Sequence, residues 1–535
     1  MSIDLSDVKQ RTLPAVLSAW AAATPNNIFL MDGELRETFA QTHEKVLKLS
    51  NGLAASGIKA GDRVAIVMGS RADYVRLVLA VNRIGAVWVP INPDYKGDWL
   101  SDAINDSLAA ALVVEEPYVD QVADVADALT PLTFITLGNA GRLAAKAIDY
   151  ASLSADSHTN VPAAPITWGD TAAILWTSGT TGRPKGVMQS HNTWIHIAEK
   201  GNANWGTREG DIGYNCLPLY NSAAWCATIL RCLVAGIPVA IDAHFSVTKF
   251  WDRIRYYGAT QTMSLGAMHM FLYNAPPRPD DRDNPLRAAG LIPIPEHLIE
   301  PFCERFGIEL VVQGYGQSEV MSLLTRRTAP GDPIKPNSLG VAWPDVDIKL
   351  VDEDGREVPV GTPGEFAIRP KTPNLIFNGY FNNEEATANA WIDGWYRTGD
   401  LGRQDEDGDW FFVDRKKDYI RYKGRSIPSF MIEHVAMKHP AVAECAAFGI
   451  ASAELESEHE IKLDVVPRPG QNVEPADLAR FINDNAPYFV VPRYIEIREK
   501  LPYTPTNKVE KYKLREAGVG PATWDREAVK FEVRR

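Results

Sequence analysis

The fold is decided by the stretch Trp176-Thr177-Ser178-Gly179-Thr180-Thr181-Gly182-Arg183-Pro184-Lys185-Gly186. It crowds four hydroxyl side chains among three glycines, with a lysine close to its end. Glycine lets a backbone approach a ligand closely, while hydroxyls, backbone N–H groups and a lysine charge suit phosphate oxygens. The Walker pattern Gly-x-x-x-x-Gly-Lys-Ser/Thr is absent. We therefore predict a phosphate-binding loop of another kind; the alternative is an ordinary surface loop, which also favours these residue types.

The residues on either side of this loop predict a strand and a helix. Ala172-Ala173-Ile174-Leu175 is short and apolar, as a buried strand is. Apolar residues recur at helical spacing over 191–200, and Ser190 is placed to cap that helix. The loop is thus expected between a strand and a helix.

Composition narrows the class of protein. The 535 residues are too many for one core, so we expect two or more domains. A net charge of -13 argues against a nucleic-acid-binding protein. The five cysteines form no Cys-x-x-Cys pair, which argues against zinc and disulfides and favours a reducing compartment. With no signal peptide and no long apolar run, we expect a cytoplasmic protein without a membrane span.

Two stretches alternate strands with helices. The first has strands at 64–67 and 87–90 around a helix at 73–83. The second has strands at 238–241 and 260–265 around a helix at 247–257. This alternation predicts α/β units with largely parallel sheets.

A further strand, 309–312, runs into Gln313-Gly314-Tyr315-Gly316-Gln317-Ser318-Glu319. Ligands of open α/β sheets lie beyond the carboxyl ends of strands, so this loop and the first one suit one nucleotide pocket. Tyr315 is a candidate to stack on a base and Glu319 to hold Mg²⁺. The alternative for Glu319 alone is a solvated acid.

The pattern of apolar residues and turns changes after residue 345. Short apolar runs separated by Asp-Gly turns predict a small antiparallel β subdomain over 345–414. It contains Tyr396-Arg397-Thr398-Gly399-Asp400, in which Asp400 could accept both hydroxyls of a ribose. Taken alone, it is more often a turn aspartate.

Residues 414–425 form a mainly basic run, where we place a domain boundary. Beyond it, helices at 429–438 and 474–485 and strands at 443–449, 461–466 and 494–496 predict a separate α+β domain. It ends in a proline-rich loop that carries Lys508.

Together, these motifs resemble the acyl-adenylate-forming (AMP-binding) superfamily from about residue 12 to 516. The order is the phosphate loop, 314–319, 396–400, Asp-Arg-Lys-Lys-Asp at 414–418, and Lys508. Within the acyl-CoA synthetase branch, the chain looks most similar to carnitine/crotonobetaine-type CoA ligases, through 302–307 among others. The resemblance implies a large N-terminal domain (1–414) of two α/β subdomains and a β subdomain, and a small mobile α+β domain (415–535).

The resemblance also implies an activity, an ATP-dependent carboxylic acid–CoA ligase that uses Mg²⁺ and forms an acyl-adenylate, AMP and pyrophosphate. Mg²⁺ and Lys508 would offset the repulsion between the attacking carboxylate and the α-phosphate. Transfer of the acyl group to a carrier protein or an amine stays open, as does a non-catalytic nucleotide-binding module. The identity of the acid and the oligomeric state are not indicated.

The resemblance also implies a full set of residue roles. Catalysis is assigned to Lys508, Glu319 and Thr180, with Glu319 also the metal ligand. ATP binding is assigned to Thr177, Ser178, Gly179, Thr180, Thr181, Gly182, Lys185, Gly314, Tyr315, Gly316, Ser318, Asp400 and Arg415. The acyl pocket is assigned to Asn221, Trp225, Ser264 and Gly266. The CoA site is assigned to Tyr422, Lys423, Gly424 and Arg425, and the hinge to Lys417.

Three positions depart from the family pattern. Asn221 stands where most acyl-CoA ligases have a gating histidine, and the usual Gly-Gly-Ala-Pro turn is bulkier at 289–293. Asn507 replaces the glycine before the catalytic lysine. None of these removes a charge that the chemistry needs. Trp225 is read either as a wall that favours a compact acid or as a core tryptophan.

Overall fold

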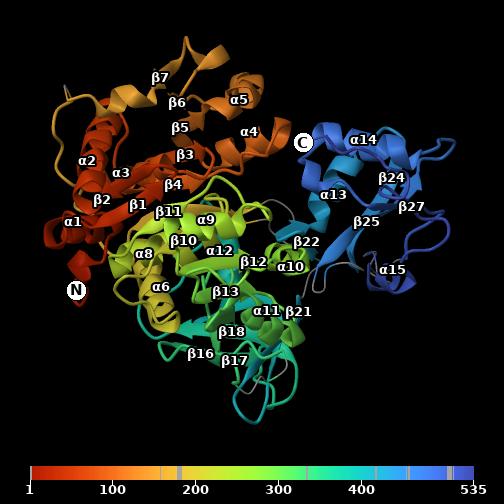
Figure 1. Ribbon diagram of the computed structural model, residues 1–535. Coiled ribbons are helices and arrows are strands. Elements are labelled where there is room, and N and C mark those ends of the chain that lie inside the picture. Colours follow the sequence, from red (N-terminus) through yellow and green to blue (C-terminus); the bar gives the residue numbers. More distant parts are fainter. Residues whose placement is uncertain are drawn as a thin grey trace.

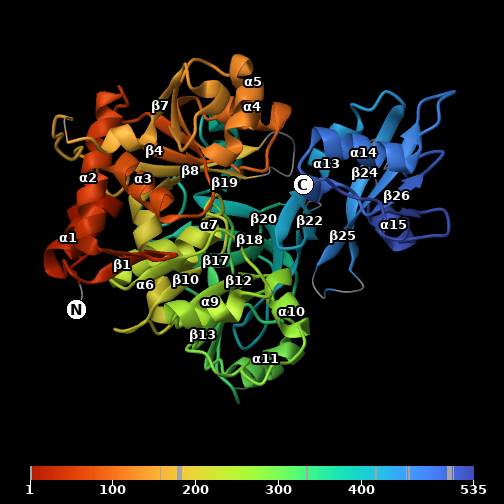
Figure 2. The ribbon, with the colours of Figure 1, turned by 45° about the horizontal axis from the view of Figure 1, so that its top comes forward.

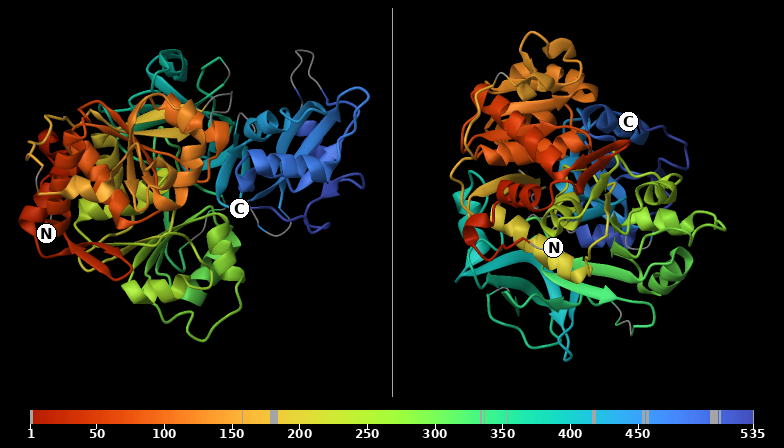
Figure 3. Two further views of the ribbon diagram at one scale, coloured as in Figure 1. Left: turned by 90° about the horizontal axis from the view of Figure 1, so that it is seen from above. Right: turned by 60° about the vertical axis from the view of Figure 1, so that its left-hand side comes forward.

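The computed structural model describes residues 3–156, 158–177, 184–332, 335, 337–352, 354–415, 419–452, 455, 458–502, 509 and 511–534. A large body carries two mainly parallel sheets and a β subdomain, and a smaller C-terminal unit lies to one side (Figure 1). Figures 2 and 3 show the same separation from other directions. Within the described residues, no helix has the length and apolar character needed to cross a bilayer.

The first sheet has seven strands in the order β7-β6-β5-β3-β4-β8-β9. All neighbours are parallel except β8 and β9. In chain order the strands are β3 (Arg63–Val67), β4 (Val87–Pro90), β5 (Ala109–Glu115), β6 (Thr133–Leu137), β7 (Ala147–Asp149), β8 (Thr171–Thr177) and β9 (Lys185–Ser190). The accompanying helices are α1 (Leu13–Ala23), α2 (Phe39–Ala55), α3 (Ala72–Arg83), α4 (Gly97–Asp106) and α5 (Val119–Val125).

The second sheet has nine strands in the order β16-β15-β14-β13-β12-β10-β11-β1-β2. They are β1 (Ile28–Asp32), β2 (Leu35–Thr38), β10 (Gly213–Asn215), β11 (Val239–Ile241), β12 (Gln261–Leu265), β13 (Ala288–Ile292), β14 (Leu310–Tyr315), β15 (Leu324–Thr328) and β16 (Val341–Ala342). One face carries α9 (Phe250–Tyr257) and α11 (Ile299–Phe306), whose apolar side chains share a core. On the other face are α6 (His191–Asn204), α7 (Ser222–Ala224), the π-helical turn η6 (Trp225–Ile229) and α8 (Leu230–Ala235), whose core is continuous with the first sheet. Helix α10 (Ala267–Asn274) follows β12.

The β subdomain is a five-stranded antiparallel sheet in which β18 and β20 form the centre. Its strands are β17 (Val346–Val351), β18 (Gly364–Pro370), β19 (Trp391–Ile392), β20 (Trp395–Gln404) and β21 (Trp410–Arg415), and α12 (Glu384–Ala390) precedes β19. Its aromatic side chains pack on the end of β14, as the stacked rings of Phe366 and Tyr315 show (centroids 5.2 Å apart).

The C-terminal unit has its own apolar core. A hairpin, β22 (Tyr419–Tyr422) and β23 (Arg425–Pro428), leads to α13 (Ser429–Ala436). The sheet β24-β25-β26-β27 follows, with strands at Val442–Ala451, His459–Pro467, Tyr494–Ile497 and Trp524–Asp525. Helices α14 (Pro475–Asn485) and α15 (Lys511–Ala517) complete it.

The start of α4 meets this C-terminal unit. Trp99 packs against the C-terminal core. Lys438 pairs with Asp98 at 2.7 Å, and Nη2 of Arg425 lies 3.4 Å from Oδ2 of Asp94. These ion pairs therefore join two units that are distant in sequence.

The predicted α/β class, the β subdomain and the C-terminal α+β elements are confirmed. Ser190 caps α6, with its hydroxyl accepting from the Thr193 N–H at 3.0 Å. One local expectation is corrected, because Lys185 and Gly186, predicted as the end of the loop, begin a return strand, β9, on the edge of β8. Its glycine-containing sequence has no clear alternation, so its pairing with β8 defines it. The boundary at 414/415 stays a prediction, since 416–418 lie outside the described residues.

Candidate functional site

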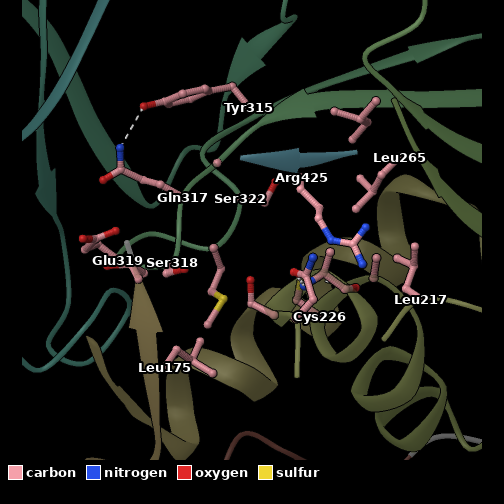
Figure 4. Close-up of a pocket in the computed structure, with 18 of the residues that line it drawn as sticks. Leu175, Leu217, Cys226, Leu265, Tyr315, Gln317, Ser318, Glu319, Ser322 and Arg425 are labelled. Atoms are coloured by element: carbon pink, nitrogen blue, oxygen red, sulfur yellow. Dashed lines mark hydrogen bonds between the residues drawn. The ribbon is translucent and has the colours of Figure 1, made fainter. Parts of the chain in front are cut away.

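A cavity of about 1520 Å³ lies where the two large sheets, the β subdomain and the C-terminal hairpin meet. In Figure 4, Ser318 and Glu319 lie on one side of it, and Leu217 and Arg425 on the other. The loop after β14 reaches it from the carboxyl end of that strand, as ligand sites of open α/β sheets do. The two sides of the cavity are built from different elements and carry different chemistry.

Tyr315 and Asp400 are joined by a hydrogen bond, although 85 positions separate them. The Tyr315 hydroxyl donates to Oδ2 of Asp400 at 2.7 Å, and Nε2 of Gln317 donates to the same oxygen at 3.1 Å. Tyr396 holds the Gln317 amide by donating to its Oε1 at 2.6 Å. Burial together with the Asp400 charge raises the pKa of Tyr315 well above its ordinary value, so the hydroxyl stays a donor. This network fixes the Asp400 carboxylate at the cavity wall.

Glu319 lies almost fully buried at the next part of the wall. The Tyr380 hydroxyl donates to its Oε1 at 2.9 Å, and Nζ of Lys185 sits 4.6 Å from the centre of the Tyr380 ring. Burial raises the pKa of Glu319, against the opposing effects of the Tyr380 hydrogen bond and the Lys185 charge. Burying an ionised carboxylate costs free energy unless a cation or hydrogen-bond donors compensate its charge.

Of the predicted phosphate loop, Thr177 and Lys185 are described, and both line the cavity. They face each other across β8 and β9. The predicted Ser178, Gly179, Thr180, Thr181 and Gly182 lie outside the described residues, as do Lys417 and Lys508. The Arg415 backbone pairs with Asp400 across β20 and β21.

The four residues predicted for the acyl pocket divide into two pairs. Asn221 and Gly266 line the cavity, and Asn221 also caps α7 by accepting from the Ala223 N–H at 3.1 Å. Trp225 and Ser264 are absent from the described lining. The Trp225 side chain is wholly buried, and its Nε1 donates to the Leu219 carbonyl at 2.6 Å. Ser264 instead contacts Nδ1 of His269 at 3.1 Å.

The placement of Trp225 in the acyl pocket is therefore corrected. Its ring packs 4.7 Å from that of Trp88, in the core. The physical reason is the π-helical turn η6 that begins at Trp225, which changes the direction in which successive side chains point. Cys226 lines the cavity in its place.

Three of the four residues predicted for CoA line the cavity, namely Lys423, Gly424 and Arg425. They form and follow the turn between β22 and β23, where Lys423 and Gly424 have positive φ. Tyr422 instead points into the C-terminal core and accepts from Nη2 of Arg526 at 3.3 Å. The structure thus brings the hairpin tip to the cavity and leaves Tyr422 as its support.

Several cavity residues were missed by the sequence reading. Gln313 and Gln317 flank Tyr315 within the stretch 313–319; for Gln313, which alternates with Tyr315 along β14, that alternation was the available signal. Tyr396 opens the 396–400 motif but had been given no role, whereas Tyr380 and Glu458 lie in no motif that the sequence showed. Glu458 accepts from the Gly424 N–H at 3.2 Å, which ties the hairpin tip to β25.

The described residues of the site bear on how a metal ion could be held. In the parts of the chain that the structure describes, no group of three His, Cys, Asp or Glu could hold an ion. Mg²⁺ is commonly bound through one or two carboxylates plus the phosphates of a nucleotide. The buried carboxylate of Glu319 fits that mode of binding.

Comparisons with known proteins agree with this geometry. The model of the AMP-binding enzyme family matches residues 17–381, and that of the AMP-binding enzyme C-terminal domain matches 431–508. A crotonobetaine/carnitine–CoA ligase from Salmonella enteritidis is 30% identical over 491 residues, covering 90% of this chain and 94% of the relative. That of Escherichia coli O157:H7 is 29% identical over 489 residues, covering 90% and 93%.

Two solved structures have the same fold over nearly their whole length. o-Succinylbenzoate CoA synthetase from Bacillus subtilis, bound with a product analogue, superposes with a TM-score of 0.82 at 25% identity, covering 94% of this chain and 98% of that one. An amide bond synthetase from Marinactinospora thermotolerans gives 0.82 at 25% identity, covering 95% and 100%. The family model covers well over half of the chain, and the chain therefore belongs to the AMP-binding enzyme family.

Proposed function

We propose that this protein is an ATP-dependent carboxylic acid–CoA ligase. In the first step, a carboxylate oxygen attacks the α-phosphorus of ATP, the bond to the β-phosphate oxygen breaks, and pyrophosphate leaves. In the second step, the CoA thiolate attacks the acyl carbonyl, and AMP leaves with the electron pair of the acyl–oxygen bond. The observation that carries the proposal is one cavity that joins the Tyr315–Asp400 network to the C-terminal hairpin tip.

The nucleotide is assigned to the side of Tyr315 and Asp400. The Asp400 carboxylate suits two ribose hydroxyls, because an ionised carboxylate accepts several hydrogen bonds. Gln313 lies two positions before Tyr315 in β14, lines the cavity, and has an Oε1 with no partner among the described residues. We assign it to the adenine amino group. Glu319 would hold Mg²⁺, which supplies charge neutralisation at the phosphates.

The remaining roles rest on the family resemblance. Ser178 to Gly182 and Lys185 would hold the β- and γ-phosphates, Arg415 the ribose, and Lys508 the α-phosphate and the attacking carboxylate. The C-terminal domain, taken as 415–535, would turn about Lys417 between the steps. Lys423, Gly424 and Arg425, which the structure brings to the cavity, would then line the path of the CoA thiol.

A cytoplasmic location is part of this proposal. All five cysteines are free. Free thiols, three of them fully buried, suit a reducing compartment in which CoA and ATP are also available.

The test uses the purified full chain with ATP, Mg²⁺ and a panel of aliphatic, aromatic and betaine acids, with and without CoA. Mass spectrometry reads acyl-AMP, acyl-CoA and AMP. We expect acyl-CoA and AMP together, and Lys508→Ala is expected to slow acyl-AMP formation about 10²- to 10³-fold. Lys530→Ala, a lysine far from the cavity lining, serves as the matched control.

Other products would indicate one of the alternative functions. Acyl-AMP that reacts with amines but not with CoA would make the protein an amide-forming enzyme, like the synthetase from Marinactinospora thermotolerans by name. Absence of AMP with every acid would overturn the proposal and favour a non-catalytic module.

A further inference from the structure

Arg231 stands directly behind the wall of the cavity opposite the nucleotide side. It is the second residue of α8, and its side chain is wholly buried. Its Cζ lies 4.4 Å from the centre of the Trp205 ring, and its Nε donates to the Ala227 carbonyl at 2.8 Å. Both Trp205 and Ala227 line the cavity. A third lining residue, Gly201, is so close that an added Cβ would sit 3.0 Å from Cδ of Arg231.

The charge of Arg231 is poorly neutralised. Among the described residues, its Nη1 donates to neutral acceptors, namely the Thr207 hydroxyl at 2.8 Å and the amide oxygens of Gln261 and Asn202. Its Nη2 is buried and has no partner among the described residues. Arginine keeps its proton in proteins, so a buried cation lies here.

The carboxylate that is linked to this cation through Gln261 is already engaged. Asp211 is reached through Gln261, whose Nε2 donates to it at 3.0 Å. Arg287 holds the same carboxylate, with Nε donating to Oδ1 at 2.8 Å. Two arginines therefore share one acid, and an excess of positive charge remains behind the wall.

Among the described residues, no acid that lines the cavity belongs to the elements packed on Arg231; Glu458 approaches this side at Gly266, where its carboxylate accepts from the Gly424 N–H. The acidic residues that line the cavity, among those described, are Glu319, Glu365, Glu385, Asp400 and Glu458. None of them lies on α6, η6, β12 or the segment 216–223, which form this side. Trp205 would ordinarily attract a quaternary ammonium group, but one face of its ring already carries a cation.

We propose that the acyl side of the cavity takes carboxylic acids whose distal part carries no positive charge, and that it discriminates against quaternary ammonium acids. This inference rests on the proposed ligase function and names its substrate class. It separates the chain from the relatives named crotonobetaine/carnitine–CoA ligase, since betaines carry such a group. Uncharged aliphatic or aromatic acids, and acids with a distal hydrogen-bond acceptor, are the substrates that remain.

The experiment compares two acids of the same shape. 4-(Trimethylammonio)butanoate and 5,5-dimethylhexanoate differ in having N⁺ or carbon at the branched centre. For a distal charge about 8 Å from Arg231 at an effective dielectric constant of about 20, we expect kcat/KM for pyrophosphate release to favour the neutral acid roughly 30-fold. Equal use of the two acids, or preference for the charged one, would overturn the inference.

A variant separates the Arg231 charge from the general cost of desolvating a cation. Arg231→Met is expected to shrink the preference for the neutral acid by about tenfold. Arg369→Met is the matched control, because Arg369 also stacks on a tryptophan, Trp395 at 4.5 Å, but neither residue lines the cavity. An unchanged ratio in Arg231→Met, or an equal change in Arg369→Met, would count against the role of Arg231.

The same pair of acids is also measured by calorimetric binding in the presence of AMP. This readout needs no turnover, and the wild-type comparison needs no variant that folds. If no acid supports AMP formation, the ligase function fails, while the binding preference still decides the charge discrimination.

Discussion

Oδ2 of Asp94 and Nη2 of Arg425 lie 3.4 Å apart across the boundary between the large body and the C-terminal unit. The Arg425 guanidinium also lies over the ring of Phe489, 4.5 Å from its centre, so a cation–π contact within the C-terminal unit helps to hold it. If the C-terminal unit turns between the two steps, this contact forms in only one of its positions. That position is the one in which the hairpin tip reaches the cavity.

Asp94→Asn is therefore expected to slow thioester formation about two- to fivefold and to leave acyl-AMP formation unchanged. The size follows from the modest strength of ion pairs near the surface. Single-turnover kinetics, with and without CoA, separate the steps. Asp354→Asn, which breaks an exposed pair with Arg356, is the control. Equal slowing of both steps by Asp94→Asn would contradict this role.

Gly266→Ala is expected to hinder the same docking by sterics. The φ of Gly266 is +45°, and an added Cβ would collide with Oε1 of Glu458 and lie 3.5 Å from Cα of Gly424. We expect a loss of about 1–3 kcal/mol in stability from the backbone strain, and a larger loss in thioester formation than in acyl-AMP formation.

Gly408→Ala provides the comparison for Gly266→Ala. Its φ is +88°, but nothing lies within 4 Å of an added Cβ, so it carries the strain without the collision. Thermal melts and the two half-reactions are measured for both variants. A selective thioester defect in Gly408→Ala as well would show that strain alone explains the effect.

Tyr315→Phe is expected to weaken ATP binding. It removes the hydroxyl that orients Asp400, and a hydrogen bond to a charged group contributes about 1.5–3 kcal/mol. The KM for ATP should rise roughly 10- to 100-fold, with little change in the KM for the acid. Tyr256→Phe is the matched control, because its hydroxyl also donates to a carboxylate, that of Glu34 at 2.6 Å, at the surface. A change confined to kcat would contradict an orienting role in ATP binding.

Stability is expected to fall with acidification because of buried His191. Burial lowers its pKa to about 4, and its Nδ1 accepts from the Leu13 N–H at 3.3 Å. The unfolded chain binds the proton below pH 6.5, whereas the folded chain resists it until about pH 4. The free energy of unfolding contributed by this residue therefore declines across that window, by up to roughly 3 kcal/mol.

Urea unfolding of the wild type and of His191→Gln at several values of pH between 7 and 4 measures this contribution. The variant should be less stable at pH 7 and should depend less on pH. His158→Gln, a substitution of a partly exposed histidine, should follow the wild type. Parallel curves for the wild type and His191→Gln would show that His191 is not the source.

Much of the fold was predictable because strands and helices alternate with strong apolar patterns. Tyr315 and Asp400 were each predicted to bind the nucleotide, Tyr315 in the loop after the strand 309–312 and Asp400 as a ribose ligand, and the structure brings the two side chains together. The hydrogen bond between them could not be read from the sequence, because it depends on how the β subdomain docks on β14.

The acyl side was less predictable for two physical reasons. The π-helical turn η6 places the Trp225 side chain in the core and Cys226 at the cavity. The residues of this stretch gave no pattern from which the turn could be predicted. Arg231 interrupts an apolar run and would ordinarily be placed on a solvated face. Its polar partners come from Thr207 and Gln261, distant segments that only the tertiary fold brings together.

The ion pairs that join α4 to the C-terminal unit have a consequence for the ionic environment. Asp94, Asp98, Arg425 and Lys438 are all at least 30% exposed, so dissolved ions screen their attraction. Rising ionic strength then weakens the docked position of the hairpin while the buried Tyr315–Asp400 contact is largely unaffected. The ratio of the rate of thioester formation to the rate of acyl-AMP formation should therefore fall as the salt concentration rises.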